Sequence, residues 1–284
     1  MISGIVKVGT GSGQLIVPLI AAFLIAKYGW RNAYLIISAA IFIILIVAAQ
    51  VLRRDPHSMG LLPDNDIENT SGPLTESEES GLTLKAAAVT RQLWIICLVW
   101  FTVFFCILTI PVHIVPHARD LGLSPASAAG ILSTIGGVSM LGRIVMGTAN
   151  DRLGGKRSLI VCFVILLCAL LWLQFSNKAW MLFLFASIYG FSHGGFFTVV
   201  SPTVAEFFGT SSHGVLFGII LFSGTIGGAI GPIMAGAIYD EVGSYQITFL
   251  ILTGVGSIGL VMIGLLKPVS NRLSRERVSQ GRRK

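Results

Sequence analysis

Gly147-Thr-Ala-Asn-Asp151-Arg152-Leu-Gly154-Gly-Lys156-Arg157 separates two long apolar segments and carries one acid and three bases within residues 151–157. Glycine adopts a positive φ at little cost, so Asp151 and Gly154 are expected to begin and bend a short polar turn. Lys156 and Arg157 directly precede the next apolar run, where basic residues anchor a membrane helix. On a soluble chain the same residues would be only a charged turn, so the membrane assignment needs evidence from the rest of the sequence.

The composition indicates a membrane protein. Hydrophobic residues make up 54% of the 284 residues and charged residues 12%, about half the charged fraction of a typical soluble domain. The 33 glycines would weaken soluble helices, whereas membrane helices use small residues to pack closely. We therefore predict an all-α polytopic protein embedded in the lipid bilayer.

Eight membrane spans are predicted, because eight apolar runs have about the length that crosses a bilayer as a helix. They cover residues 5–26, 32–52, 92–115, 126–148, 158–175, 179–201, 212–238 and 245–267. Pro111 and Pro116 are expected to close the third span. The chain then divides into two spans in residues 1–52, an acidic solvated linker in 53–91, six spans in 92–267 and a basic tail in 268–284.

Basic residues are distributed unevenly between the two sets of loops. One set contains fourteen Lys and Arg, seven of them from Lys267 onward, and the other contains four. Loops rich in Lys and Arg stay in the cytoplasm, so the stretch 147–157 and both termini are predicted to be cytoplasmic in a plasma (inner) membrane. The net charge of +7 reflects this topology, and no nucleic-acid partner is expected.

The spacing Gly147-x-x-x-Asp151-Arg152-x-Gly154-x-Lys156-Arg157 resembles the loop signature of the major facilitator superfamily of secondary transporters. Residues 28–34, Tyr-Gly-Trp-Arg-Asn-Ala-Tyr, resemble that family's link between its fifth and sixth helices. The resemblance implies the major facilitator fold, with the eight spans as helices five to twelve of a twelve-helix transporter. The first four helices would be missing because the sequence is a fragment or its start is misplaced; a genuine eight-helix protein is the third reading.

Residues 113–125, together with Gly142-Arg143-Ile-Val-Met-Gly147, are similar to the monocarboxylate and oxalate/formate branch of that family. The resemblance implies alternating-access movement of a small organic anion by proton symport or anion exchange. In that branch an acid one turn before the arginine often pairs with it; here Ser139 holds that position, which argues against an Asp–Arg proton mechanism. The span 212–238 lacks the basic residue of oxalate/formate exchangers, so a monocarboxylate fits better than a dicarboxylate.

Arg143, with Ser139 on the same helix face, is the leading candidate for substrate binding. A charged side chain inside an apolar helix costs about 2.5–3.5 kcal/mol, and a carboxylate held by two hydrogen bonds from the guanidinium would offset that cost. Because Arg143 lies only four residues from Gly147, its side chain could instead extend to the membrane surface.

Two histidines are further substrate-site candidates. His193 lies in the middle of its span, where it could relay a proton or bind the substrate, or pack as a neutral ring. His113 lies near the outer end of its span and could line the outer vestibule.

Conformational change is assigned to two groups: Gly147, Asp151, Arg152, Gly154, Lys156 and Arg157 in the signature, and Gly231 and Pro232 in the run 227–236. That run gives close helix packing and a bend, with or without a role in gating. A helix N-terminus attracts a carboxylate, and the resemblance implies that Asp151 clasps the eleventh helix, beginning near Ser212, when the cytoplasmic side is closed. The basic residues would bridge the two halves or bind acidic lipid.

No catalytic motif is visible in the sequence: it has no nucleophile elbow, phosphate-binding loop or metal-ligand spacing. We therefore expect neither an enzyme nor a cofactor. The expected partners are a small organic anion, protons and the bilayer. The rival reading is a non-transporting binding or regulatory subunit, or an inactive truncated transporter.

Overall fold

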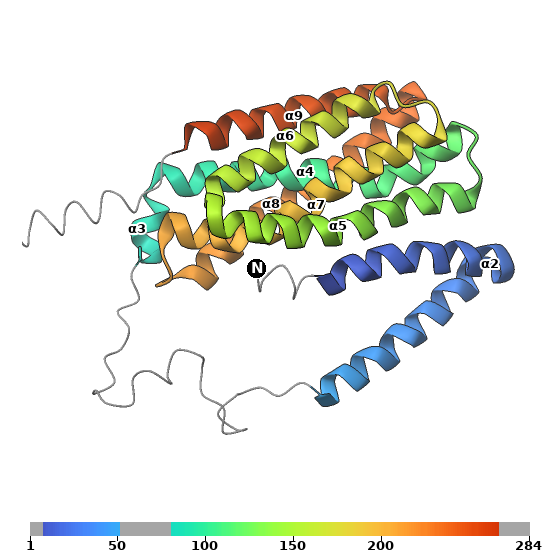
Figure 1. Cartoon of the computed structure of the whole chain (residues 1–284), viewed down its shortest axis with the longest axis horizontal. Coiled ribbons are helices and arrows are strands. Elements are labelled where there is room, and N and C mark those ends of the chain that lie inside the picture. Colours follow the sequence, from blue (N-terminus) through green and yellow to red (C-terminus); the bar gives the residue numbers. More distant parts are fainter. Residues whose placement is uncertain (1–7, 52–80, 267–284) are drawn as a thin grey trace, which may run out of the picture. The chain divides into compact units, whose positions relative to one another are not determined.

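The computed structural model describes residues 8–51 and 81–266, and these residues form a series of helices (Figure 1). The elements are α2 (Val8–Val51), α3 (Leu84–Ala88), α4 (Arg91–Asp120), α5 (Pro125–Leu153), α6 (Gly155–Leu173), α7 (Ala179–Phe208), α8 (His213–Val242) and α9 (Gln246–Leu265). Within the described ranges, seven of them are long and apolar enough to cross a membrane. The predicted all-α membrane fold is confirmed.

A kink at Gly29 divides α2 into two arms. Gly29 has φ 74° and ψ 163°, a conformation open mainly to glycine, so the first two predicted spans are the arms on either side of it. Next to the kink, the Trp30 and Tyr34 rings meet edge-to-face at 6.5 Å and Lys27 lies over Tyr28. Such an aromatic and basic cluster is typical of a helix end at the membrane surface.

Residues 81–266 pack together with residues 8–20 as one compact unit, and residues 21–51 belong to a second unit. In the first unit, α4 lies against α8 and α5 against α7 at glycine contacts. A Cβ on Gly227 would collide with the Phe101 carbonyl of α4, and one on Gly142 with the Phe191 carbonyl of α7. The backbones can approach this closely only because no side chain separates them.

The third predicted span is longer than expected, because α4 continues through Pro111 and Pro116 to Asp120. A proline at 111 removes the N–H that would bond the Ile107 carbonyl. The Tyr189 hydroxyl of α7 donates to that carbonyl at 2.7 Å. The lost backbone bond is therefore replaced by a neighbouring helix, as happens in membrane bundles, and the expectation that the prolines close the span is wrong.

The signature stretch is almost entirely helical. α5 runs to Leu153, α6 begins at Gly155, and Gly154 with φ 81° is the residue between them. The expected polar turn beginning at Asp151 is thus reduced to a single glycine with a positive φ. The linker 53–91 also differs: α3 forms within it, with the Thr83 hydroxyl accepting from the Ala86 N–H, while residues 53–80 and the tail 268–284 lie outside the described part.

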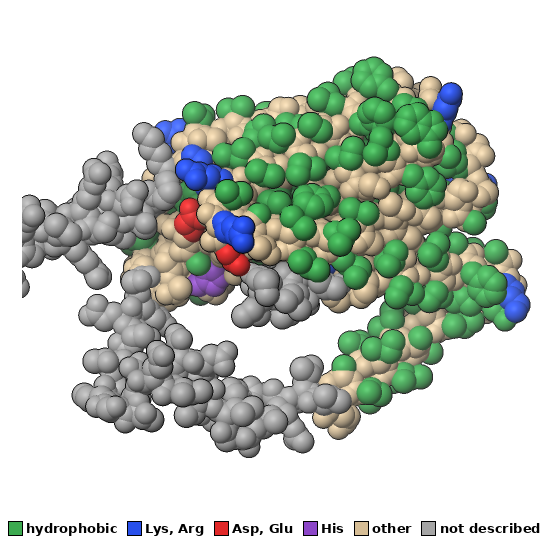
Figure 2. Space-filling view, in the orientation of Figure 1, with side chains coloured by type: hydrophobic (Ala, Val, Ile, Leu, Met, Phe, Trp, Pro, Cys, Tyr) green, Lys and Arg blue, Asp and Glu red, His purple; other side chains and the backbone are tan. Residues whose placement is uncertain are grey.

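Figure 2 shows hydrophobic side chains along the length of the bundle formed by α4–α9, with the visible charged side chains near its ends. Large exposed apolar residues, such as Leu141, Phe222 and Leu250, are 59–68% exposed. A surface of this kind suits contact with lipid or with other membrane helices. We call the end that contains the α5–α6 joint the signature end, and the end that contains the α8–α9 turn the far end.

Candidate functional site

Arg143 is buried in the bundle instead of extending to its end. The residue is 3% exposed, and its guanidinium carbon lies over the Phe197 ring of α7 at 5.8 Å from the ring centre. An arginine over an aromatic face gains a cation–π attraction that is strongest where water is excluded. The side chain is held by this packing, so it does not reach the membrane surface as the alternative sequence interpretation required.

His193 lies one helical turn before Phe197 on α7 and is 4% exposed. Its ring centre is 5.1 Å from that of Phe197 and 5.9 Å from that of Tyr189. Within the described ranges, no hydrogen-bond partner reaches its Nδ1 atom. Arg143 and His193 therefore meet on one aromatic ring, from two helices, deep in the bundle.

Ser139 and the first arm of α2 complete this site on the other side. The Ser139 hydroxyl donates to the Gly136 carbonyl at 2.7 Å. A Cβ added to Gly11 would lie 2.9 Å from Nη1 of Arg143 and 3.2 Å from the Ser139 hydroxyl. Gly11 thus provides the space that these two side chains occupy between α2 and α5.

Phe104 of α4 contributes the apolar wall, with its ring 5.7 Å from that of Phe197. We call Ser139, Arg143, His193, Phe104 and Phe197 the central site. The sequence reasoning missed both phenylalanines. Phe197 stands four residues after His193, a helical spacing that could have suggested it, whereas Phe104 is one of 17 phenylalanines with no local signal.

His113 lies outside the central site. Its Nε2 lies 2.9 Å from the Pro232 carbonyl of α8 and its Nδ1 lies 3.2 Å from the Tyr245 hydroxyl. The structure therefore brings His113 together with Pro232, and with neighbouring Gly231, near the far end of the bundle. A role of His113 in lining the outer vestibule for the substrate stays a prediction.

The α5–α6 joint is tied to α7 and α9. The Gly155 N–H donates to the Glu206 carboxylate, which stabilises the N-terminus of α6. Lys156 Nζ donates to the carbonyls of Gly264 at 2.8 Å and Leu266 at 2.6 Å, so it satisfies the C-terminal end of α9. Glu206 was missed because an acid near a helix end resembles an ordinary solvated charge.

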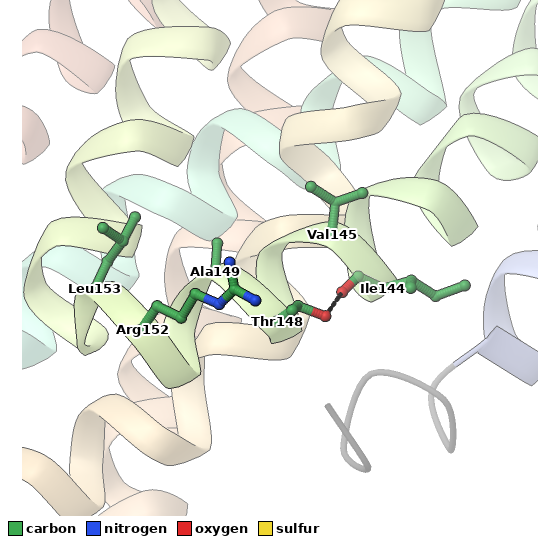
Figure 3. Close-up of a pocket in the computed structure, with 6 residues that line it drawn as sticks. All are labelled: Ile144, Val145, Thr148, Ala149, Arg152 and Leu153. Atoms are coloured by element: carbon green, nitrogen blue, oxygen red, sulfur yellow. Dashed lines mark hydrogen bonds between the residues drawn. The ribbon is translucent and has the colours of Figure 1, made fainter.

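The remaining signature residues lie on the surface or beside it. Gly147 is buried, while Asp151, Arg152 and Arg157 are exposed. Arg152 helps to line a surface hollow of about 480 Å³ whose walls all come from α5 (Figure 3): Ile144, Val145, Thr148, Ala149, Arg152 and Leu153. The contact of Asp151 with the start of α8 stays a prediction.

This geometry describes a multi-pass helical membrane protein with a buried cationic and aromatic centre. The chain belongs to the Major Facilitator Superfamily, whose family model matches residues 1–148 and 114–283.

Similar proteins are longer than this chain. It is 25% identical over 302 residues to monocarboxylate transporter 12 of Rattus norvegicus, covering 97% of this chain and 61% of that protein. It is also 25% identical over 255 residues to monocarboxylate transporter 13 of the same species, covering 87% and 55%. The fold matches the crystal structure of the major facilitator transporter FucP in its outward conformation, with a TM-score of 0.56 and 15% identity over 83% of this chain and 54% of that one.

Proposed function

We propose that this chain serves in secondary active transport of a small organic anion, and that the anion is a monocarboxylate. The observation that carries the proposal is the buried guanidinium of Arg143 in the central site. The similarity to proteins named monocarboxylate transporters supports it.

The chemistry of the central site suits one carboxylate joined to an apolar body. The planar guanidinium can offer two parallel N–H donors to a carboxylate, while Phe104 and Phe197 offer apolar surface beside it. Charge attraction is strong in such a water-poor environment. α8 contains no Lys or Arg, which favours one negative charge on the solute over two.

Alternating access would expose this site to each side in turn, driven by an ion gradient. Ser139 is neutral, so proton coupling would need a different titratable group, of which His193 is the nearest candidate. Anion exchange is the other option. The distribution of Lys and Arg supports a cytoplasmic location for the signature end and both termini, and the contact of Asp151 with α8 would then close that side.

The test is uptake of labelled monocarboxylates and dicarboxylates by cells that express this chain. Arg143→Ala is expected to abolish monocarboxylate uptake, and Arg143→Lys to retain only part of it because an ammonium cannot reproduce the paired donors. Arg119→Ala is the matched control, since Arg119 is exposed and donates to the Leu123 carbonyl.

Unchanged uptake by the Arg143→Ala variant would refute the assignment of the central site. Binding of a monocarboxylate without flux, in the unmodified chain, would instead favour a binding or regulatory subunit. A preference for dicarboxylates would contradict the single-charge argument.

A further inference from the structure

One imidazole joins α4, α8 and the α8–α9 turn near the far end of the bundle. His113 of α4 bonds through Nε2 to the Pro232 carbonyl and through Nδ1 to the Tyr245 hydroxyl. A carbonyl only accepts hydrogen bonds, so Nε2 carries the hydrogen. In the neutral ring Nδ1 is then an acceptor, and Tyr245 is the donor.

The Tyr245 hydroxyl keeps its proton and can therefore act as a hydrogen-bond donor. Burial, followed by the nearby charge of Asp120, raises the pKa of Tyr245 to about 12. The ring is also fixed, because it stacks on Tyr239 at 4.4 Å and on Phe249 at 6.0 Å. The phenol therefore stays protonated and in place over the physiological pH range.

The bond to Pro232 lies where α8 is easiest to bend. Proline has no N–H, so the Gly228 carbonyl four residues earlier loses its partner in the helix. Before this point, α8 is pressed against α4: a Cβ on Gly224 would lie 3.3 Å from the Trp100 carbonyl, and one on Gly231 would lie 2.6 Å from the Phe105 carbonyl.

Beyond Pro232 the contact between α8 and α4 is looser. A Cβ on Gly236 would lie 3.8 Å from Cε1 of His113, an ordinary contact distance, whereas one on Gly224 or Gly231 would meet backbone and side-chain atoms of α4 within 3.4 Å. Hydrogen bonds from a side chain can break and reform at modest cost, whereas interlocked backbones cannot separate without losing their packing.

We propose that His113 is a positioning residue that holds residues 233–242 of α8 against α4, and that releasing its bonds to Pro232 and Tyr245 lets α8 bend at Pro232. This role is distinct from contact with a substrate, and it does not depend on which solute the protein carries. His113 would then be the residue with which the Gly231-Pro232 pair acts in conformational change.

The test measures how often position 236 becomes accessible. Gly236→Cys is introduced together with Cys168→Ser, because Cys168 is the exposed cysteine while Cys97, Cys106 and Cys162 are buried. The purified protein is treated with a water-soluble maleimide, and the labelling rate at position 236 is followed by mass spectrometry.

His113→Ala in this background is expected to raise the labelling rate by about tenfold, the change that corresponds to losing roughly 1.4 kcal/mol of attachment. Tyr245→Phe should give a smaller increase, because one of the two bonds remains. His113→Gln should keep the slow rate, since its amide offers an NH2 donor group and a carbonyl acceptor. Val112→Ala, at an exposed neighbour on α4, is the control and should change nothing.

An unchanged rate in the His113→Ala variant would overturn the proposal, and so would a failure of His113→Gln to keep labelling slow. Faster labelling of the buried Cys162 in the His113→Ala variant would show general loosening of the bundle, which also overturns it. The assay contains no solute, so its outcome is independent of the anion-transport experiment.

Discussion

Arg143 and His193 are titratable residues buried in the described part of the bundle. Both are at most 4% exposed, and polar groups at membrane depth are costly unless they are bonded or functional. Arg143 gains a cation–π contact with the Phe197 ring. His193 keeps an Nδ1 atom without a hydrogen-bond partner in the described part of the chain, which suggests a bond made only during function.

His193→Leu distinguishes a functional histidine from a packing one. If His193 bonds the anion or the coupling ion, leucine should lower uptake about tenfold, since a buried hydrogen bond contributes roughly 1 kcal/mol or somewhat more. His193→Gln should retain part of the uptake. Initial uptake rates against substrate concentration measure this, and full uptake by the leucine variant would mark His193 as packing.

At this scale the sequence singled out Arg143 as a candidate but did not predict the direction of its side chain. Arg143 stood out as a charge inside an apolar run. Its direction was open, because four residues from Gly147 is close enough for an extended side chain to reach the surface. The direction is set by α7, which approaches at Gly142 and brings Phe197 over the guanidinium. A contact between distant segments of this kind leaves no local pattern.

At the scale of elements, helix ends hold the signature end together. Glu206 of α7 bonds the first N–H of α6, and Lys156 of α6 bonds the last carbonyls of α9. Each charge meets the end of a helix whose dipole it complements. Lys156 was predicted to act in conformational change; here it fastens two neighbouring helices of the same bundle.

Glu206→Gln is expected to lower the stability of the bundle by about 1 kcal/mol, since an amide oxygen is a weaker partner for a helix N-terminus than a carboxylate. Thermal unfolding of the purified protein should show a lower midpoint. Glu241→Gln, at an exposed acid near the end of α8, is the control. Equal midpoints for the two variants would contradict the role of Glu206.

Element boundaries were predicted less well than element existence. All the spans were found from their apolar runs, but α4, α5 and α7 extend beyond the predicted limits. Sequence rules end a helix at proline or at a charged run. In α4 the Tyr189 hydroxyl compensates for Pro111, and in α5 the charged residues simply continue the helix beyond the apolar part.

At the scale of the whole molecule, the distribution of charge and apolar surface predicts an orientation of the α4–α9 bundle in the membrane. Apolar side chains run along its length (Figure 2). Arg152 at the end of α5 and Lys156 and Arg157 at the beginning of α6 put three bases at the signature end. The cytoplasmic side attracts such clusters through both the insertion rule and its acidic lipids. The orientation can therefore be tested with two exposed turn residues that carry no proposed role.

Asn177→Cys and Thr210→Cys, each with Cys168→Ser, form that pair: both positions are exposed, in the α6–α7 and α7–α8 turns. A membrane-impermeant maleimide added to intact cells should label position 177, and it should label position 210 only after permeabilisation. The reverse pattern would invert the predicted topology, and with it the side on which Asp151 acts.

The joint at Gly154 couples the position of α6 to that of α5. Only one residue separates α5 from α6, so we expect a displacement of the end of α5 to move the beginning of α6. Lys156 then carries the displacement to α9. A displacement of α5 near Arg143 would in this way be transmitted to α6 and then to α9, with the backbone turning at Gly154.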